Sequence, residues 1–233
     1  MDPTTRPLPV RPAPSNGLTD ILRKSGSLMA TRGYHATSMR ELALATGRSL
    51  SGLYHYFRNK EDLLFLINQR GFERLDRASR EVEVAFPDPV SRLYAFIYVH
   101  TRYFVDHMDE MRVMTWGTHE LAVPRAREIH DLQDRYAARV RQAVRDVDLR
   151  MRGNAPADAR LDRETYLLFG MMNWMFTWYS PDAHGRPEEL VSDMFLTFVG
   201  GLGGALPAGA NLAAIETSVT RWYRDHAEEE AAK

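Results

Sequence analysis

The 233-residue sequence contains no cysteine. This absence excludes disulfide frameworks, thiol nucleophiles, and zinc or iron–sulfur centres held by thiolates. Lysine is also scarce, because only three of the 30 basic residues are lysines. Any contacts with phosphate groups would therefore fall mainly to the forked guanidinium groups of arginine. Hydrophobic residues make up 44% and charged residues 26% of the chain, which is the composition of a globular protein and not of a wholly disordered one.

Long uninterrupted hydrophobic runs are missing as well. The 22 residues of Met194–Ile215 carry no charge, which is long enough to span a bilayer, but several glycines and Pro207 interrupt them. Residues 1–17 hold five prolines and no apolar run, so they do not form a signal peptide, and we interpret them as a disordered arm. We expect a cytoplasmic protein without a membrane partner.

The formal net charge of −1 conceals two regions of opposite sign. Residues 1–80 carry 13 basic and 7 acidic side chains, a net charge of +6, whereas residues 81–233 carry 17 and 24, a net charge of −7. Such a division predicts a basic module joined to an acidic domain. A net charge close to zero would by itself argue against a nucleic-acid partner, but the basic module makes such a partner possible.

Apolar residues recur with the helical period along almost the whole chain, and no strand pattern of useful length interrupts them. The sequence therefore predicts an all-α fold of nine or ten helices. The expected helices span residues 19–31, 39–46, 49–57, 60–86, 89–108, 124–147, 162–179, 187–199 and 211–227.

The second and third of these helices are joined by only a few residues. Ser38 and Glu41 have the spacing of a capping box at a helix start, and Gly47 suits a left-handed position at the end of that helix. Ser49 is placed to cap the next helix. Two short helices separated in this way are typical of a helix-turn-helix, whose second helix enters the major groove of B-DNA.

The residues at this turn suggest how a duplex would be contacted. Small residues at the start of the third helix allow close approach to base edges, while Tyr54 and His55 offer donors to phosphate oxygens. We expect Leu53, Tyr56 and Phe57 to pack into the core. The candidate DNA-binding residues are Thr37, Ser38, Arg40, Arg48, Ser49, Leu50, Ser51, Tyr54, His55 and Lys60.

This region resembles the DNA-binding domain of the TetR/AcrR family of bacterial transcriptional regulators. The resemblance rests on Gly33-Tyr34, Thr37-Ser38-Met39, Leu42-Ala43, Gly47, Ser49, Leu53-Tyr54-His55-Tyr56-Phe57 and Asn59-Lys60-Glu61-Asp62-Leu63-Leu64. It implies a DNA-binding domain at residues 18–66 with three helices in its helix-turn-helix unit. Two positions depart from the family pattern: Ser51, and Arg48, which either reads a base or contacts a phosphate.

The same resemblance implies a helical ligand-binding and dimerisation domain at residues 67–233. It also implies a homodimer on a palindromic double-stranded operator, released by a small-molecule effector. The residues agree with this, because the segment 166–179 is apolar around its whole circumference and must be covered on several sides. Together with the helix at 187–199, it could form a four-helix bundle with the same helices of a second subunit.

Methionine and aromatic residues suit an adaptable apolar cavity, although ordinary core packing is the alternative at each position. The candidate ligand-binding residues are Tyr103, Phe104, Met108, Met114, Trp116, His119, Tyr136, Trp174 and Trp178. The segment 169–179 is similar to members of the family that control acyl-CoA catabolism. That similarity implies an acyl-CoA effector, with Arg102, Arg135 or Arg139 near the mouth of the cavity to meet the phosphates.

Catalytic patterns are weak by comparison. His119-Glu120 begins like a zinc-protease motif, but Val123 stands where its second histidine is required. His100 and His107 are seven residues apart on one expected helix, and no third metal ligand is indicated. We therefore expect no enzyme activity, no cofactor and no metal. The alternatives to a regulator are a helical-bundle enzyme and a structural or interaction protein that does not bind DNA.

Overall fold

The computed structural model describes residues 17–202, so the expected N-terminal arm and the expected helix at 211–227 lie outside the described residues. The described part is all-α and has no strand. Its helices are α1 (Gly17–Arg32), α2 (Met39–Thr46), α3 (Leu50–Tyr54), α4 (Lys60–Ala85), α5 (Pro89–Asp106), α6 (Met108–Gly117), η1 (Thr118–Glu120), α7 (Val123–Arg152), α8 (Asp158–Asn173), η2 (Trp174–Thr177), α9 (Pro181–His184) and α10 (Pro187–Leu202). One compact unit extends to Phe195, and the second begins at Leu196 within α10. Among these helices, none is both long and apolar enough to cross a membrane.

The local signals at the helix-turn-helix are confirmed. The Ser38 hydroxyl accepts a hydrogen bond from the Glu41 amide at 3.3 Å, and the Glu41 carboxylate accepts one from the Ser38 amide at 2.8 Å. Gly47 ends α2 with φ of 68°, a left-handed conformation that costs a residue with a Cβ about 1–2 kcal/mol. The Ser49 hydroxyl then caps α3 by accepting from the Gly52 amide at 3.0 Å.

A small apolar core holds the first three helices together. Ile21 and Leu22 of α1, Leu42 of α2 and Leu53 of α3 are all buried, as is Phe57 just beyond α3. Helix α3 is shorter than predicted, because it ends at Tyr54 and the chain continues to Phe57 as a turn. The burial of Leu53 and Phe57 still fixes which side of α3 faces outward.

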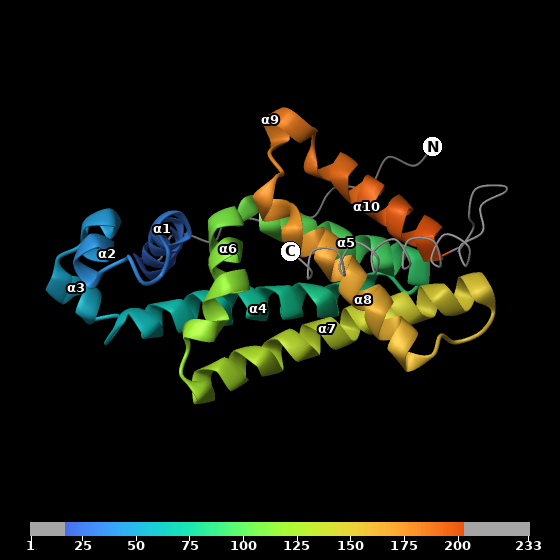
Figure 1. Cartoon of the computed structure of the whole chain (residues 1–233), viewed down its shortest axis with the longest axis horizontal. Coiled ribbons are helices and arrows are strands. Elements are labelled where there is room, and N and C mark those ends of the chain that lie inside the picture. Colours follow the sequence, from blue (N-terminus) through green and yellow to red (C-terminus); the bar gives the residue numbers. More distant parts are fainter. Residues whose placement is uncertain (1–16, 203–233) are drawn as a thin grey trace, which may run out of the picture. The chain divides into compact units, whose positions relative to one another are not determined.

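Helix α4 connects this N-terminal part to the rest of the compact unit. Asn59 caps its start by accepting from the Asp62 amide at 2.8 Å. Leu63 and Leu64 are buried near that end, and Leu75 and Val82 are buried further along the same helix. Figure 1 shows α1–α3 near the start of α4, with α7 running beside α4. A single helix therefore contributes to the core of the N-terminal helices and to the core of the larger helical region.

Helix α6 was not predicted, since the sequence assigned no helix to residues 109–123. Its N-cap residue, His107, makes no side-chain capping hydrogen bond, and the helix is only 10 residues long, so neither a capping motif nor a long apolar stripe indicates it in the sequence. It crosses α4 at Gly71, where an added Cβ would lie 2.2 Å from the Met114 sulfur. It also packs against α1, and so links the N-terminal helices to the larger part of the chain.

The prediction of one helix over 162–179 is wrong in detail. Helix α8 begins earlier, at Asp158, and ends at Asn173, where the 3₁₀ helix η2 takes over. The tighter turn is visible in the amide of Trp178, which bonds to the carbonyl of Met175 at 3.2 Å. The change of helix type rotates the residues after 173 relative to those before, so a helical wheel drawn over the whole segment misplaces them.

A buried carboxylate joins α7 to α8. Asp148 on α7 is fully buried and accepts hydrogen bonds from Arg152 at 2.6 Å and from Arg160 on α8 at 3.0 Å. Arg152 and Arg160 are themselves about a third exposed, and Arg160 also pairs with Glu164. Removing Asp148 therefore mainly costs its charge-assisted hydrogen bonds, about 1.5–3 kcal/mol. Asp158, which pairs with Arg141 at 2.9 Å, is by contrast 85% exposed.

We therefore expect Asp148→Ala to lower the free energy of unfolding by about 1.5–3 kcal/mol. Asp158→Ala, which also removes an aspartate paired with arginine, should cost no more than about 1 kcal/mol, because surface ion pairs contribute little. Urea unfolding followed by circular dichroism at one protein concentration measures both. Equal losses in the two variants would contradict the role given to Asp148.

Candidate DNA-binding surface and effector region

Seven of the ten predicted DNA-binding side chains are exposed around α2 and α3. They are Ser38, Arg40, Arg48, Ser49, Ser51, Tyr54 and His55, while Leu50 is half-buried. The burial of Leu53 and Phe57 turns the opposite side of α3 to solvent, so Tyr54 and His55 are available to a partner. The arrangement presents hydroxyl, imidazole and guanidinium donors beside one short helix, which is what contacts with a duplex require.

Thr37 and Lys60 have partners within the protein. Thr37 is 1% exposed, and its hydroxyl donates to the Gly33 carbonyl at 2.8 Å. The Lys60 ammonium donates to the Tyr34 carbonyl at 2.5 Å and lies 4.2 Å from the centre of the Tyr34 ring. Burial lowers the pKa of Lys60. Both side chains hold the turn between α1 and α2, and a contact of either with phosphate stays a prediction.

Tyr56 was expected in the core, and the structure corrects this. Its side chain is 39% exposed, and the Arg48 guanidinium lies 5.6 Å from the centre of its ring. The expectation extended a helical pattern from Leu53 to Phe57, but α3 ends at Tyr54 and the turn points Tyr56 outward. Tyr56 and Arg48 therefore form an exposed cation–π pair at the edge of the surface.

The predicted ligand-binding residues are not gathered in one place. Phe104, Met114 and Tyr136 are buried, Tyr103 and Met108 are half-buried, and the side chain of Trp116 lies outside what the structure describes. His119 is exposed and lines a separate groove of about 340 Å³ with Arg127 and His130. Trp174 is 60% and Trp178 43% exposed. Whether any of them binds a ligand stays a prediction.

A polar chain lies inside the aromatic packing of α5, α7 and α8. His100 is 2% exposed; its Nδ1 lies 2.9 Å from the Tyr136 hydroxyl, and its Nε2 lies 3.1 Å from Asn173 Oδ1. Because the Asn173 oxygen can only accept, Nε2 carries the hydrogen and Nδ1 accepts from Tyr136. The ring also stacks on Phe104, with the ring centres 4.5 Å apart.

Burial lowers the pKa of His100 to about 4, although the hydrogen bond to Asn173 opposes this shift. The imidazole is therefore neutral at physiological pH and serves as a structural link between three helices. His107, which the sequence offered as a metal partner for His100, lies instead against the Tyr103 ring, with 4.6 Å between ring centres, and 3.9 Å from the Glu110 carboxylate.

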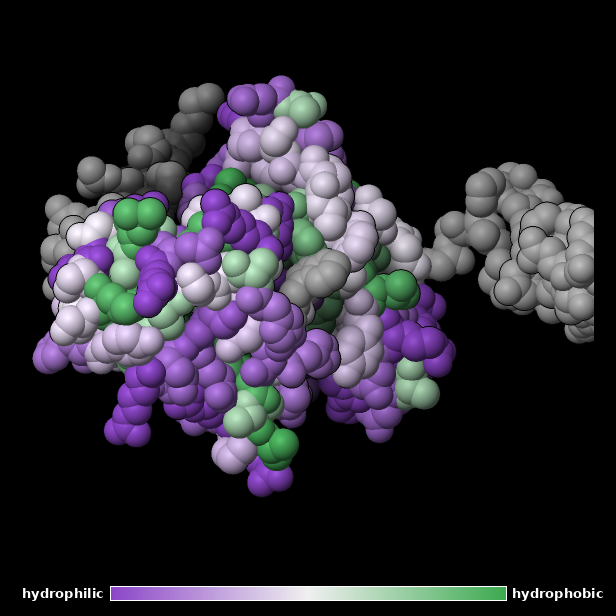
Figure 2. Space-filling model, turned by 60° about the vertical axis from the view of Figure 1, so that its left-hand side comes forward, coloured by the Kyte–Doolittle hydropathy of each residue, from purple (hydrophilic) through white to green (hydrophobic). Residues whose placement is uncertain are grey.

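The surface around these elements is mixed in character. Figure 2 shows hydrophilic residues over much of one face, separate hydrophobic residues between them, and a hollow with hydrophobic residues inside it. Larger exposed apolar side chains occur on α8 and η2, where Tyr166 is 73% and Leu167 66% exposed. These residues are candidates for burial by a partner.

An all-α chain with an exposed helix-turn-helix, joined through one long helix to a larger helical region, defines a helix-turn-helix DNA-binding regulator. Two family models match. Residues 21–67 match bacterial regulatory proteins of the tetR family, and residues 87–202 match the tetracyclin repressor-like C-terminal domain. Together they cover more than two thirds of the chain, and the chain belongs to the TetR family of transcriptional regulators.

Solved structures agree with this assignment. A TetR-family regulator from Bordetella parapertussis 12822 is 27% identical, with a TM-score of 0.75, over 84% of this chain and 100% of that one. PfmR from Thermus thermophilus is 28% identical, with a TM-score of 0.69, over 77% and 97%. AibR in complex with isovaleryl coenzyme A and operator DNA is 25% identical, with a TM-score of 0.68, over 78% and 97%. No curated protein sequence matches the chain.

The pKa of His100 makes stability depend on pH. The unfolded chain takes up a proton near the ordinary value of 6.5, whereas the folded protein does so only near 4. The contribution of neutral His100 is therefore fully present above about pH 6.5 and is lost as the pH falls towards 4, by about 3 kcal/mol in all. Urea unfolding at several pH values should show a shallower pH dependence over this interval for His100→Gln. Parallel profiles for the two proteins would contradict this assignment.

Proposed function

We propose that the protein is a dimeric repressor that binds a palindromic operator and is released by an apolar, acyl-CoA-type effector in the cytoplasm. The observation that carries the DNA-binding part is the exposed donor surface on α2 and α3, fixed by the buried Leu53 and Phe57 behind it. It lies within the region of the sequence whose net charge is +6, and a positive region favours association with the phosphate backbone.

The dimer is supported by the apolar side chains left exposed on one side of α8. Tyr166 and Leu167 of α8 are exposed together with Gly170, about one turn further along, and Trp174 is exposed at the start of η2. An exposed apolar stripe of this kind marks a protein–protein contact. A two-fold dimer formed there would present two copies of α3 to two half-sites, separated by about one helical turn of DNA. In this arrangement Trp174 contributes to the interface between subunits.

The effector proposal is supported by AibR, a structural neighbour that was crystallised with isovaleryl coenzyme A and operator DNA. In this chain the acyl group would enter the aromatic packing of Phe104 and Tyr136 around His100, where hydrophobic rings surround a few fixed polar groups. Both side chains are buried, so binding there requires α5, α7 and α8 to separate. An effector that prefers this opened state by about 1–3 kcal/mol weakens DNA binding about 5- to 150-fold.

Replacing Arg40 by alanine should weaken operator binding about 5- to 150-fold, because it removes a charged contact with the duplex. The slope of the logarithm of the binding constant against the logarithm of the salt concentration should become shallower by about one, because one fewer counterion is released. Arg145→Ala, which removes an exposed arginine from α7, is the matched control and should leave affinity unchanged. Mobility shifts on an operator selected from random duplexes measure both variants.

The same assay tests the effector. Isovaleryl coenzyme A and longer acyl-CoAs should lower operator affinity, whereas free coenzyme A should not, since it lacks the apolar group. DNA binding that is equally strong in the Arg40 variant would refute the docking. DNA binding that no acyl-CoA alters would refute the effector class and leave the docking intact.

The proposed interface predicts that Leu167→Glu shifts the protein from dimer to monomer in sedimentation experiments, because it places a charge in an apolar contact. Val84→Glu is the matched control, since Val84 is 86% exposed at the far end of α4 and outside the proposed interface. Loss of the dimer in both variants, or in neither, would argue against α8 as the contact.

A further inference from the structure

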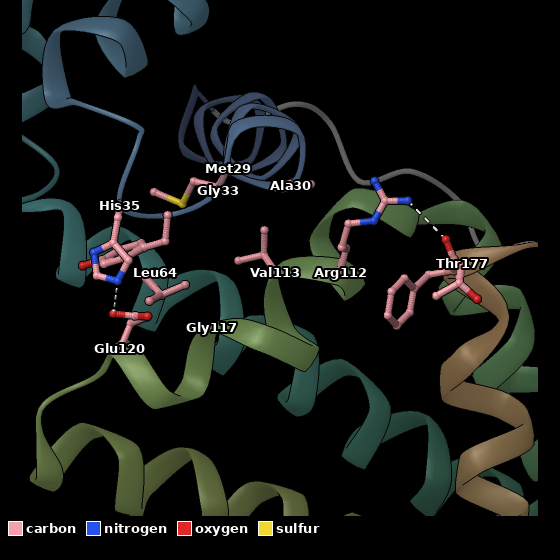
Figure 3. A pocket seen from close by; sticks show the side chains of 12 residues that line it. Met29, Ala30, Gly33, His35, Leu64, Arg112, Val113, Gly117, Glu120 and Thr177 are labelled. Carbon is pink, nitrogen blue, oxygen red and sulfur yellow. Dashed lines mark hydrogen bonds and ion pairs between the residues drawn. The ribbon is translucent and has the colours of Figure 1, made fainter. Parts of the chain in front are cut away.

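A cavity of about 600 Å³ lies between α1, α4, α6 and η2. Its walls include Met29 and Ala30 of α1, Leu64 of α4 and Val113 of α6. In Figure 3 these residues line the middle part of the cavity, with α1 on one side and α4 and α6 on the other. The volume falls in the range of sites for small ligands. The cavity therefore has an apolar centre of suitable size.

The two ends of the cavity differ in charge. At one end His35 and Glu120 pair with each other at 2.9 Å. At the other end Arg112 donates to the carbonyl of Phe176 at 3.1 Å, and its guanidinium lies 5.9 Å from the centre of the Phe176 ring. No carboxylate of the described residues forms an ion pair with Arg112 within 4.0 Å. A guanidinium has five N–H donors, so this one retains donors for an anion.

We propose that this cavity binds a small free carboxylic acid with an unbranched apolar body. Its carboxylate binds Arg112, and its hydrocarbon chain lies along Val113, Leu64 and Met29. The charge pattern sets the orientation, because Glu120 at the opposite end repels a carboxylate and is already paired with His35. An uncharged alcohol of the same length fills the apolar part but forms no ion pair with Arg112.

The position of the cavity links its occupancy to DNA binding, and this step rests on the proposed function. Met29 and Ala30 belong to α1, which packs against α2 of the helix-turn-helix, while Val113 and Arg112 belong to α6. A ligand between α1 and α6 favours the separation of these helices that fits it best. If that separation differs from the one that DNA selects, the bound acid lowers the affinity for DNA. Bound DNA then lowers the affinity for the acid by the same factor.

Calorimetric titration of the full chain with octanoate at neutral pH, below its micellar concentration, tests the site. We expect saturable binding of one octanoate per chain, with 1-octanol about tenfold weaker or more. Absence of saturable binding, or equal binding of acid and alcohol, would overturn the proposal.

Two substitutions locate the bound acid. Arg112→Gln should weaken octanoate binding about tenfold or more, and Arg112→Lys should restore part of it. Ala30→Leu should weaken octanoate binding by filling the centre of the cavity. This variant provides a second measurement in case circular dichroism shows that Arg112→Gln does not fold. Arg127→Gln in the smaller groove and Ala138→Leu on exposed α7 are matched controls that should bind as the parent does.

Unchanged binding in Arg112→Gln would overturn the site, as would a loss in Arg127→Gln. Tyr136→Phe should bind octanoate normally, and a loss there would place the acid in the aromatic packing around His100 instead. Operator affinity measured with and without octanoate then tests the link to DNA. If the operator binds but octanoate does not, this inference fails and the proposed function stands. If octanoate binds but no duplex does, the proposed function fails and the acid site stands.

Discussion

The rest of the structure depends on the continuity of α4 and on its close crossing with α6. One 26-residue helix contributes Leu63 and Leu64 near one end and Leu75 and Val82 further along. The crossing is tight, since a Cβ at Gly71 would lie 2.2 Å from the Met114 sulfur. Well-packed helices have few alternative arrangements, so a displacement of α6 moves α4 or α1 with it. The contacts of α6 with α1 and α4 therefore connect the N-terminal helices to the larger part of the compact unit.

The N-terminal part was predictable because its structure is determined locally. Ser38, Glu41 and Gly47 satisfy or terminate the backbone of one helix within a few residues, and the observed caps follow the sequence directly. Helix α6 carries no such signal, because its start lacks a side-chain cap and its position is set by contact with α1 and α4. Tyr56 illustrates the same limit. Helix α3 ends at Tyr54, earlier than the local sequence predicted, and Tyr56 is therefore exposed and does not join the core.

The candidate ligand residues show why composition alone does not define a cavity. Phe104 and Tyr136 are buried, whereas Trp174 is exposed at the start of η2. A cavity of about 600 Å³ is lined instead by Met29, Leu64 and Val113, none of which was predicted to bind a ligand. A hollow is a property of how helices approach each other, and the approach of α1 to α6 depends on residues about 80 positions apart.

The contacts that hold α1–α3 against the larger part of the chain are of two kinds. Apolar packing joins α1 to α6, while exposed His35, between α1 and α2, pairs with Glu120 of η1 at 2.9 Å. Ion pairs of this exposure contribute about 0–1 kcal/mol each and weaken with salt. Apolar contacts around a cavity are also fewer than in a filled core. The position of the helix-turn-helix is therefore held by several small free-energy contributions. A ligand that binds one position only modestly more tightly than another is sufficient to change it.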